Sequence, residues 1–252
     1  MLGHPLTDII LSSIILLTAG IVRGAAAIGP ALIVVPAFSL YLSVQEALAI
    51  VALPVLSASL WQAANRHEFR PSITRFRGML LGLVVGLPVG ALMLRQIPGR
   101  VLVLALGVLV VVAAVTDMKR VSPSISPQAE RYASPAIGLA AGFIGGFSAF
   151  WTPPIYLYLA ALRVPKNLFV TTIGISGVLG ASALVGSLWC YGPFTKTDLL
   201  LSTLAVIPTL LGVAVGDYIR GRIPQRRFQA IVSVGLIVLG LNLIVKSLAG
   251  GA

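Results

Sequence analysis

The chain has 252 residues, of which 58% are hydrophobic and only 10% are charged, and its formal net charge at pH 7 is +11. A soluble domain needs roughly 25% charged residues to cover its surface, so this composition excludes a soluble fold and predicts burial in lipid. The positive charge does not indicate a nucleic-acid-binding protein, because the cations lie between apolar runs and not along one helix face with aromatic side chains.

Taken in chain order, the sequence contains ten apolar segments. Their approximate limits are 8–24, 27–42, 45–64, 77–95, 99–117, 134–149, 152–162, 166–190, 198–219 and 225–248. About 20 residues of helix are needed to cross the hydrocarbon core, and most of these segments are long enough. The second and seventh are short and are interrupted by Gly or Pro. We therefore expect an all-α polytopic membrane protein with 8–10 transmembrane helices, two of them short or broken. No Lys or Arg precedes the first run, so it is expected to be a retained segment and not a signal peptide.

The cations predict which loops face the cytoplasm. If the N-terminus is outside and all ten segments count, the inside loops hold 13 cations and the outside loops hold 4. The inside set is Arg66, Arg70, Arg75, Arg77, Lys119, Arg120, Arg131, Arg163, Lys166, Arg220, Arg222, Arg226 and Arg227, and the outside set is Arg95, Arg100, Lys196 and Lys246. This asymmetry predicts a multi-pass protein of a bacterial inner membrane with both termini in the periplasm. Re-entrant hairpins at segments 1–2 and 6–7 would give the same loop sides, so that alternative stays open.

The chain repeats itself at an offset of 126 residues, at which Gly86 corresponds to Gly212 and Gly90 to Gly216. A polar, Pro- and Ser-rich link, expected to be a loop, separates the halves. We expect a first repeat at 1–120, a connecting loop at 121–133 and a second repeat at 134–252. Five segments per half is an odd number, so the repeats should be inverted across the membrane. Inverted repeats are typical of secondary transporters, whose substrate site lies at the repeat interface near the midplane.

The broken segments indicate where a substrate would bind. Pro30 and Pro153 are expected to begin short helices, because proline suits the first helical turn, with Gly29 and Thr152 at the cap positions. A helix start carries free amides and about half a positive charge, so it favours an anion. Ser148 precedes the second break and is a further candidate. Alternatively, the glycines only allow close helix packing and the prolines only kink helices.

Three other polar residues are second-rank candidates for substrate binding. Arg23 lies near the first break, where it either faces a substrate cavity or extends to the inner surface. Gln62 and Asn65 lie near the inner end of the third segment, where they either line a polar path or bond to neighbouring helices. Catalysis is not expected, because the sequence has no paired carboxylates, phosphate-binding loop or zinc motif. No cofactor or metal is expected either.

At these same residues the chain resembles the sulfite exporter TauE/SafE family. The resemblance is carried by Gly20 to Pro36, by Thr152-Pro-Pro-Ile-Tyr-Leu-Tyr-Leu followed by Phe169-Val-Thr-Thr172, and by Gly212 to Gly216 with Pro224. It implies a secondary transporter of a small sulfur-containing anion, with lipid and that anion as its partners. The remaining alternatives are a non-transport scaffold or assembly subunit and, third, a channel.

Overall fold

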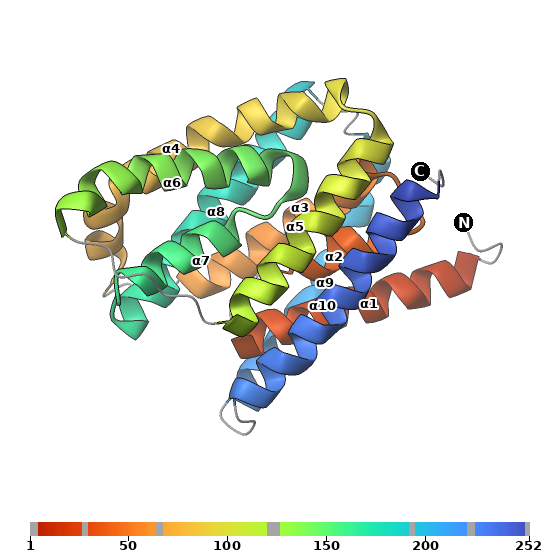
Figure 1. The fold of residues 1–252 in the computed structure, drawn as a ribbon. Helices are drawn as coiled ribbons and strands as arrows, with labels where there is room; N and C mark the ends of the chain where they lie inside the picture. The colour runs from red at the N-terminus through yellow and green to blue at the C-terminus, as the bar shows by residue number, and fades with distance from the viewer. Residues whose placement is uncertain are drawn as a thin grey trace. The chain divides into compact units, whose positions relative to one another are not determined.

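The computed structural model describes residues 5–26, 30–63, 68–119, 127–191, 195–220 and 225–249. Within these ranges the chain forms helices that match the expected segments closely (Figure 1). They are α1 Pro5–Ala26, α2 Ala31–Phe38, α3 Val44–Ala63, α4 Phe69–Gln96, α5 Gly99–Lys119, α6 Pro127–Ser148, α7 Thr152–Ala161, α8 Lys166–Tyr191, α9 Lys196–Arg220 and α10 Gln225–Leu248. The expected all-α polytopic class is confirmed.

Two helices begin earlier than the hydropathy predicts. α4 begins at Phe69 and is kinked at Phe76, whose φ and ψ are −103° and 18°. Hydropathy does not predict the first turns of α4, because they are charged. α6 begins at Pro127, inside the stretch expected to be a loop. Proline suits the first turn of a helix, and Glu130 pairs with an arginine of α4. This stretch is therefore helical although it is too polar for hydropathy to predict a helix.

Length and composition suit α3, α4, α5, α8 and α9 for crossing a membrane, among the described residues. α1 and α10 carry shorter apolar stretches, Ile10–Ala25 and Val232–Leu248. At 8 and 10 residues, α2 and α7 are too short to span the hydrocarbon core. The expectation that the second and seventh segments are short or broken is therefore confirmed.

The chain divides into two compact units that draw on both sequence halves. Unit 1 contains residues 1–54, 97–120 and 194–252, and unit 2 contains residues 55–96 and 121–193. Unit 1 therefore holds α1, α2, α5, α9, α10 and the first part of α3. Unit 2 holds the rest of α3 with α4, α6, α7 and α8. Each unit thus combines helices from both repeats.

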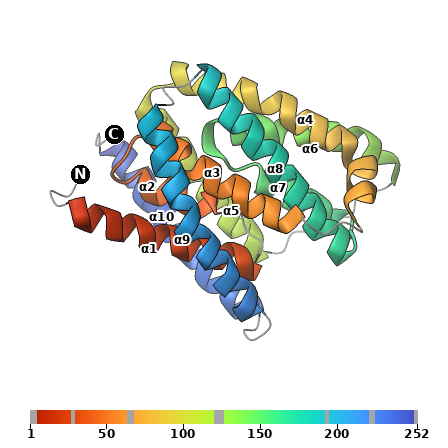
Figure 2. The same ribbon diagram turned by 180° about the vertical axis from the view of Figure 1, so that it is seen from behind.

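In each unit one pair of helices packs backbone to backbone through glycines. In unit 1 α1 lies beside α9 (Figure 2), and in unit 2 α4 lies beside α6 (Figure 1). A methyl group added at Gly20 of α1 would collide with the Thr209 carbonyl oxygen, and one added at Gly142 of α6 would collide with the Leu83 carbonyl oxygen. Thr209 and Leu83 are 126 positions apart. The two pairs therefore have the same packing arrangement, with the predicted 126-residue offset between α4 and α9 and an offset of 122 residues between Gly20 and Gly142.

The next contact along each pair repeats the correspondence. Gly24 of α1 meets the backbone of Val213 and Gly216, and Gly146 of α6 meets that of Leu87 and Gly90. In both pairs the contacts advance in the same direction along the two helices, so each pair is parallel. Small residues are the usual means by which helices approach closely in lipid, where no hydrophobic force drives helices together.

The contact between α5 and α10 agrees with the predicted inversion of the repeats. These helices occupy equivalent positions in the two halves, and both belong to unit 1. Gly107 meets Gly240, whereas Arg100, earlier in α5, donates hydrogen bonds to the carbonyl oxygens of Ser247 (2.7 Å) and Leu248 (3.2 Å), later in α10. The two equivalent helices are therefore antiparallel, which is the inversion expected from an odd number of segments per half.

The short helix α2 is held at its C-terminus by a cation from α10. Lys246 donates hydrogen bonds from Nζ to the carbonyl oxygens of Ser39 (3.0 Å), the C-cap residue, and Leu40 (3.1 Å). These carbonyls lack helical partners, and the C-terminal end of a helix dipole is negative, so an ammonium group suits this position. Nearly every residue of α2 is buried. Lys246 thus fixes a helix too short to be stable alone.

We predict that Gly142→Ala lowers the melting temperature of the detergent-purified protein, whereas Gly186→Ala does not. The added methyl at position 142 meets backbone, and overpacking of this kind costs about 1–3 kcal/mol. No atom lies within 4 Å of the corresponding position at Gly186, where alanine also gains helix propensity. A melting temperature for Gly142→Ala equal to or above that of Gly186→Ala would contradict this packing.

We also predict that Lys246→Met destabilises the protein by about 1–2 kcal/mol, because two carbonyl oxygens lose a charged donor. Lys196→Met is the matched control, because Lys196 is exposed at the start of α9. Thermal unfolding followed by circular dichroism in the same detergent measures both variants. Equal midpoints for the two would show that the Lys246 contacts do not hold α2.

Candidate functional site

The break between α6 and α7 in unit 2 is closed by its own polar groups. Ala149, which follows the last residue of α6, has a φ of 60°, and its amide donates to the Gly145 carbonyl oxygen at 2.7 Å. The Ser148 hydroxyl donates to the Ile144 carbonyl oxygen (2.5 Å) and accepts from the Phe150 amide (3.1 Å). A left-handed residue after the helix is a common way to end one. The chain can therefore turn sharply in a buried position without leaving these amides unsatisfied.

Trp151 is the N-cap residue of α7, and its indole ring is wedged between two helices. A methyl group at Gly180 of α8 would lie 2.6 Å from the indole Cε2, and one at Gly145 of α6 would lie 2.8 Å from Cε3. The side chain is only 1% exposed. Both glycines are therefore required for the ring to occupy this position, and the ring is fixed by α6 and α8.

The indole Nε1 of Trp151 has no hydrogen-bond partner among the described residues. Leaving a buried donor without an acceptor costs about 1–3 kcal/mol. Buried indole N–H groups usually find a partner. This nitrogen is therefore a buried donor that a hydrogen-bond acceptor such as an anion could use, and we treat it as a candidate ligand.

The start of α7 itself provides few amides. No side chain caps it, and prolines occupy its first turn. Because Pro153 and Pro154 have no N–H group, Thr152 is the only one of its first three residues with an amide to offer. The dipole of α7 still favours an anion at this end.

Two threonines of α8 in the same unit differ in their bonding. Thr172 donates to the Leu168 carbonyl oxygen (2.7 Å) and is hydrogen-bonded to the Ser72 hydroxyl of α4 (3.1 Å). Thr171, which is fully buried, has no partner for its hydroxyl in the described part of the chain. Thr172 therefore joins α8 to α4, whereas Thr171 is a second buried hydroxyl without a partner among the described residues.

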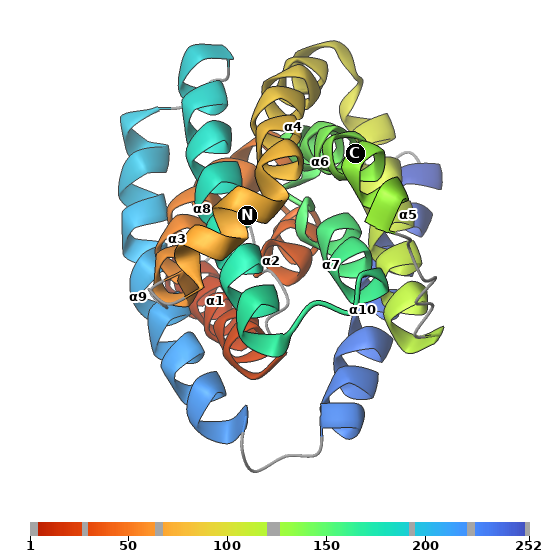
Figure 3. The ribbon, with the colours of Figure 1, turned by 90° about the vertical axis from the view of Figure 1, so that its left-hand side faces the viewer.

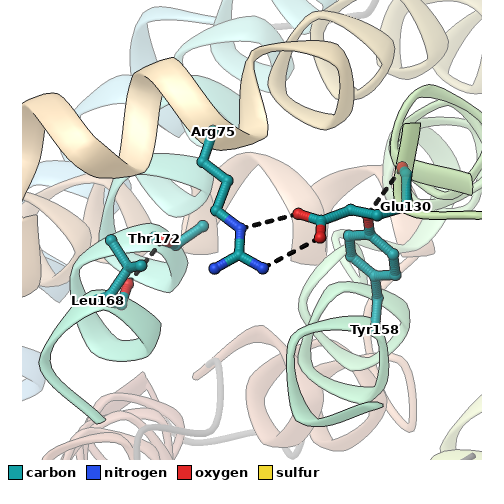
Figure 4. Close-up of polar contacts among 5 residues, drawn as sticks. All are labelled: Arg75, Glu130, Tyr158, Leu168 and Thr172. Carbon is teal, nitrogen blue, oxygen red and sulfur yellow. Dashed lines mark hydrogen bonds and ion pairs between the residues drawn. The ribbon is translucent and has the colours of Figure 1, made fainter. Parts of the chain in front are cut away.

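An ion pair ties three helices of unit 2 together (Figure 4). Arg75 of α4 donates from Nε and Nη2 to the two carboxylate oxygens of Glu130 on α6, at 2.8 and 3.0 Å. Tyr158 of α7 donates from its hydroxyl to the Glu130 carbonyl oxygen at 3.3 Å. Bidentate arginine–carboxylate pairs fix geometry as well as adding energy. The cluster therefore sets the position of α7 relative to α4 and α6, whose packing is visible in Figure 3.

The site residues predicted from the sequence fall into three groups. Gly29 and Asn65 lie outside the described residues. Arg23, which is 2% exposed, and Pro30, which is buried, belong to unit 1. The other four belong to unit 2: Gln62, Ser148, Thr152 and Pro153. Among these four, Ser148 and Thr152 flank the same break, whereas Gln62 packs its backbone against Gly174 of α8.

The expected helix starts require a correction of one residue each. Pro30 is the N-cap of α2, which begins at Ala31, and Trp151, not Thr152, is the N-cap of α7. Both cap residues have helical dihedral angles, and neither cap is closed by a side chain. Compared with the proline pattern, α2 begins one residue later and α7 begins one residue earlier. The sequence reasoning missed Trp151 and the Arg75–Glu130 pair. A tryptophan directly before Thr-Pro-Pro was the available signal.

Comparison with known proteins gives one family match. No curated protein and no solved structure showed significant similarity to the chain. The family model described as Sulfite exporter TauE/SafE matches residues 12–243. This match covers nearly the whole sequence and includes both breaks, and the chain therefore belongs to the sulfite exporter TauE/SafE family of membrane transporters.

Proposed function

We propose that the protein is a secondary transporter that exports sulfite, a sulfonate or an organosulfur acid across the inner membrane by alternating access. The family match supports transport of a sulfite-type anion. The observation that carries the site is the buried, unpartnered indole N–H of Trp151 at the start of α7. The positive-inside count supports a periplasmic location for both termini.

In the proposed site the anion accepts hydrogen bonds at the dipole-positive end of α7. The donors are the Trp151 indole N–H and the Thr152 side chain and amide. These groups carry no full positive charge, so they bind an anion without trapping it, as transport requires. Ser148 supports the site indirectly, because its hydroxyl is used within the break. Arg23 and Pro30 belong to unit 1, and their part in substrate binding stays a prediction from the sequence.

The driving force need not include a coupled ion. An inside-negative potential moves an anion outward with about 2.3 kcal/mol per charge per 100 mV. A neutral, hydrogen-bonding site suits such export, since release on the outer side then requires no proton or counter-ion to displace the substrate.

We predict that purified protein in liposomes supports saturable sulfite efflux that is accelerated by an interior-negative potential. Protein-free liposomes are the control, and chloride and acetate replace sulfite in parallel experiments to test selectivity. Efflux equal to that of empty liposomes at every gradient would contradict transport and favour the scaffold alternative. A flux that rises linearly with sulfite concentration would contradict alternating access and favour a channel.

We predict that Trp151→Phe, in protein that still folds, weakens sulfite binding about tenfold or more. Phenylalanine keeps an aromatic ring between Gly145 and Gly180 but removes the N–H donor, and hydrogen bonds to charged groups contribute about 1.5–3 kcal/mol. Trp189→Phe, at an exposed position on α8, is the control. Isothermal titration calorimetry measures both dissociation constants, and equal affinities for the two variants would remove Trp151 from the site.

A further inference from the structure

Unit 2 contains a basic pocket between α4 and α6 that the proposed transport site does not use. It has a volume of about 660 Å³ and is lined by Arg75, Arg77 and Arg131, by the hydroxyls of Thr74 and Ser134, and by Glu130. Glu130 is paired with Arg75. Neither Arg77 nor Arg131 has an ion-pair partner within the described ranges of the chain. The pocket thus holds three guanidinium groups and one carboxylate, which leaves it with a net positive charge.

An apolar groove meets this pocket at α4. The groove has a volume of about 520 Å³ and is lined largely by aliphatic side chains of α4 and α8, among them Leu80, Val84, Ile175 and Val178. Arg77 and Leu81 line both the groove and the basic pocket. A ligand could therefore place a charged group in the pocket and a hydrocarbon chain in the groove at the same time.

Large exposed side chains lie on α4 and α6 near the two cavities. Phe69 and Ile73, at the start of α4, are 43% and 40% exposed, and Tyr132, beside Arg131, is 77% exposed. Aromatic side chains at such positions are typical of the headgroup level of a membrane. Basic pockets between transmembrane helices are suited to anionic lipid headgroups.

We propose that the basic pocket and the apolar groove together bind one anionic phospholipid from the surrounding leaflet. Its phosphate contacts Arg77 and Arg131, and an acyl chain lies along the groove. Free phosphate would leave the groove empty. A second copy of this chain is a poor occupant, because the protein carries a net charge of +11 and would face a cationic pocket with a cationic partner.

The test is native mass spectrometry of the detergent-purified full chain with added dioleoyl phosphatidylglycerol or dioleoyl phosphatidylcholine. We expect one phosphatidylglycerol to be retained preferentially, and an Arg77→Ala/Arg131→Ala variant to lose this preference by about thirtyfold, since each arginine near anionic lipid contributes about 1 kcal/mol. Arg70→Ala is the matched control, because Arg70 is exposed on the same helix but lines neither cavity. The control should keep the preference.

Further measurements on the wild-type protein keep the proposal testable if the double variant fails to fold. Inorganic phosphate at millimolar concentration should not displace phosphatidylglycerol, and lysophosphatidylglycerol should be retained more strongly than glycerol 3-phosphate. Equal retention of the two dioleoyl lipids, displacement by phosphate alone, or a dimer that excludes phosphatidylglycerol would each overturn the proposal. None of these results depends on sulfite transport, so the lipid site and the proposed function can fail separately.

Discussion

Close contact between helix backbones is the interaction on which the rest of this structure depends. In lipid no hydrophobic force brings helices together, so close packing between the helices must hold them in contact. α1 with α9 and α4 with α6 approach through glycines whose missing side chains leave room only for a neighbouring backbone. Each pair joins a helix of one repeat to a helix of the other, and this is why the compact units mix the two halves of the sequence.

Close packing also makes a broken helix possible. Inside a membrane every amide and carbonyl needs a partner within the protein. At the α6–α7 break Ser148 and the left-handed Ala149 satisfy the freed backbone groups, and in unit 1 Lys246 does the same for the end of α2. The chain around Trp151 is therefore well satisfied except for its indole nitrogen. Because the backbone groups at the break have partners and the indole nitrogen has none among the described residues, we treat the break as a candidate anion site.

Much of the fold could be predicted from the sequence, because the hydropathy pattern and the 126-residue offset are both obtained from the residues alone. The helix limits, the two short helices and the inversion followed from them. The helical turns at Phe69 and Pro127 could not, since they are polar, and the Arg75–Glu130 pair beside them joins residues that are 55 positions apart. For the site, the sequence predicted only the positions of the two breaks. Proline and glycine marked the breaks, but the packing of Trp151 against Gly180 is a tertiary contact that no local pattern predicts.

The central claim is that the indole N–H of Trp151 is a ligand for the transported anion, and nuclear magnetic resonance can observe that group directly. The chain has three tryptophans, so ¹⁵N-tryptophan labelling gives three indole signals, and the one from Trp151 is identified by its loss in a Trp151 substitution. The account predicts that sulfite moves this signal downfield in a saturable manner while those of Trp61 and Trp189 stay in place. A Trp151 signal that does not respond to saturating sulfite would contradict it.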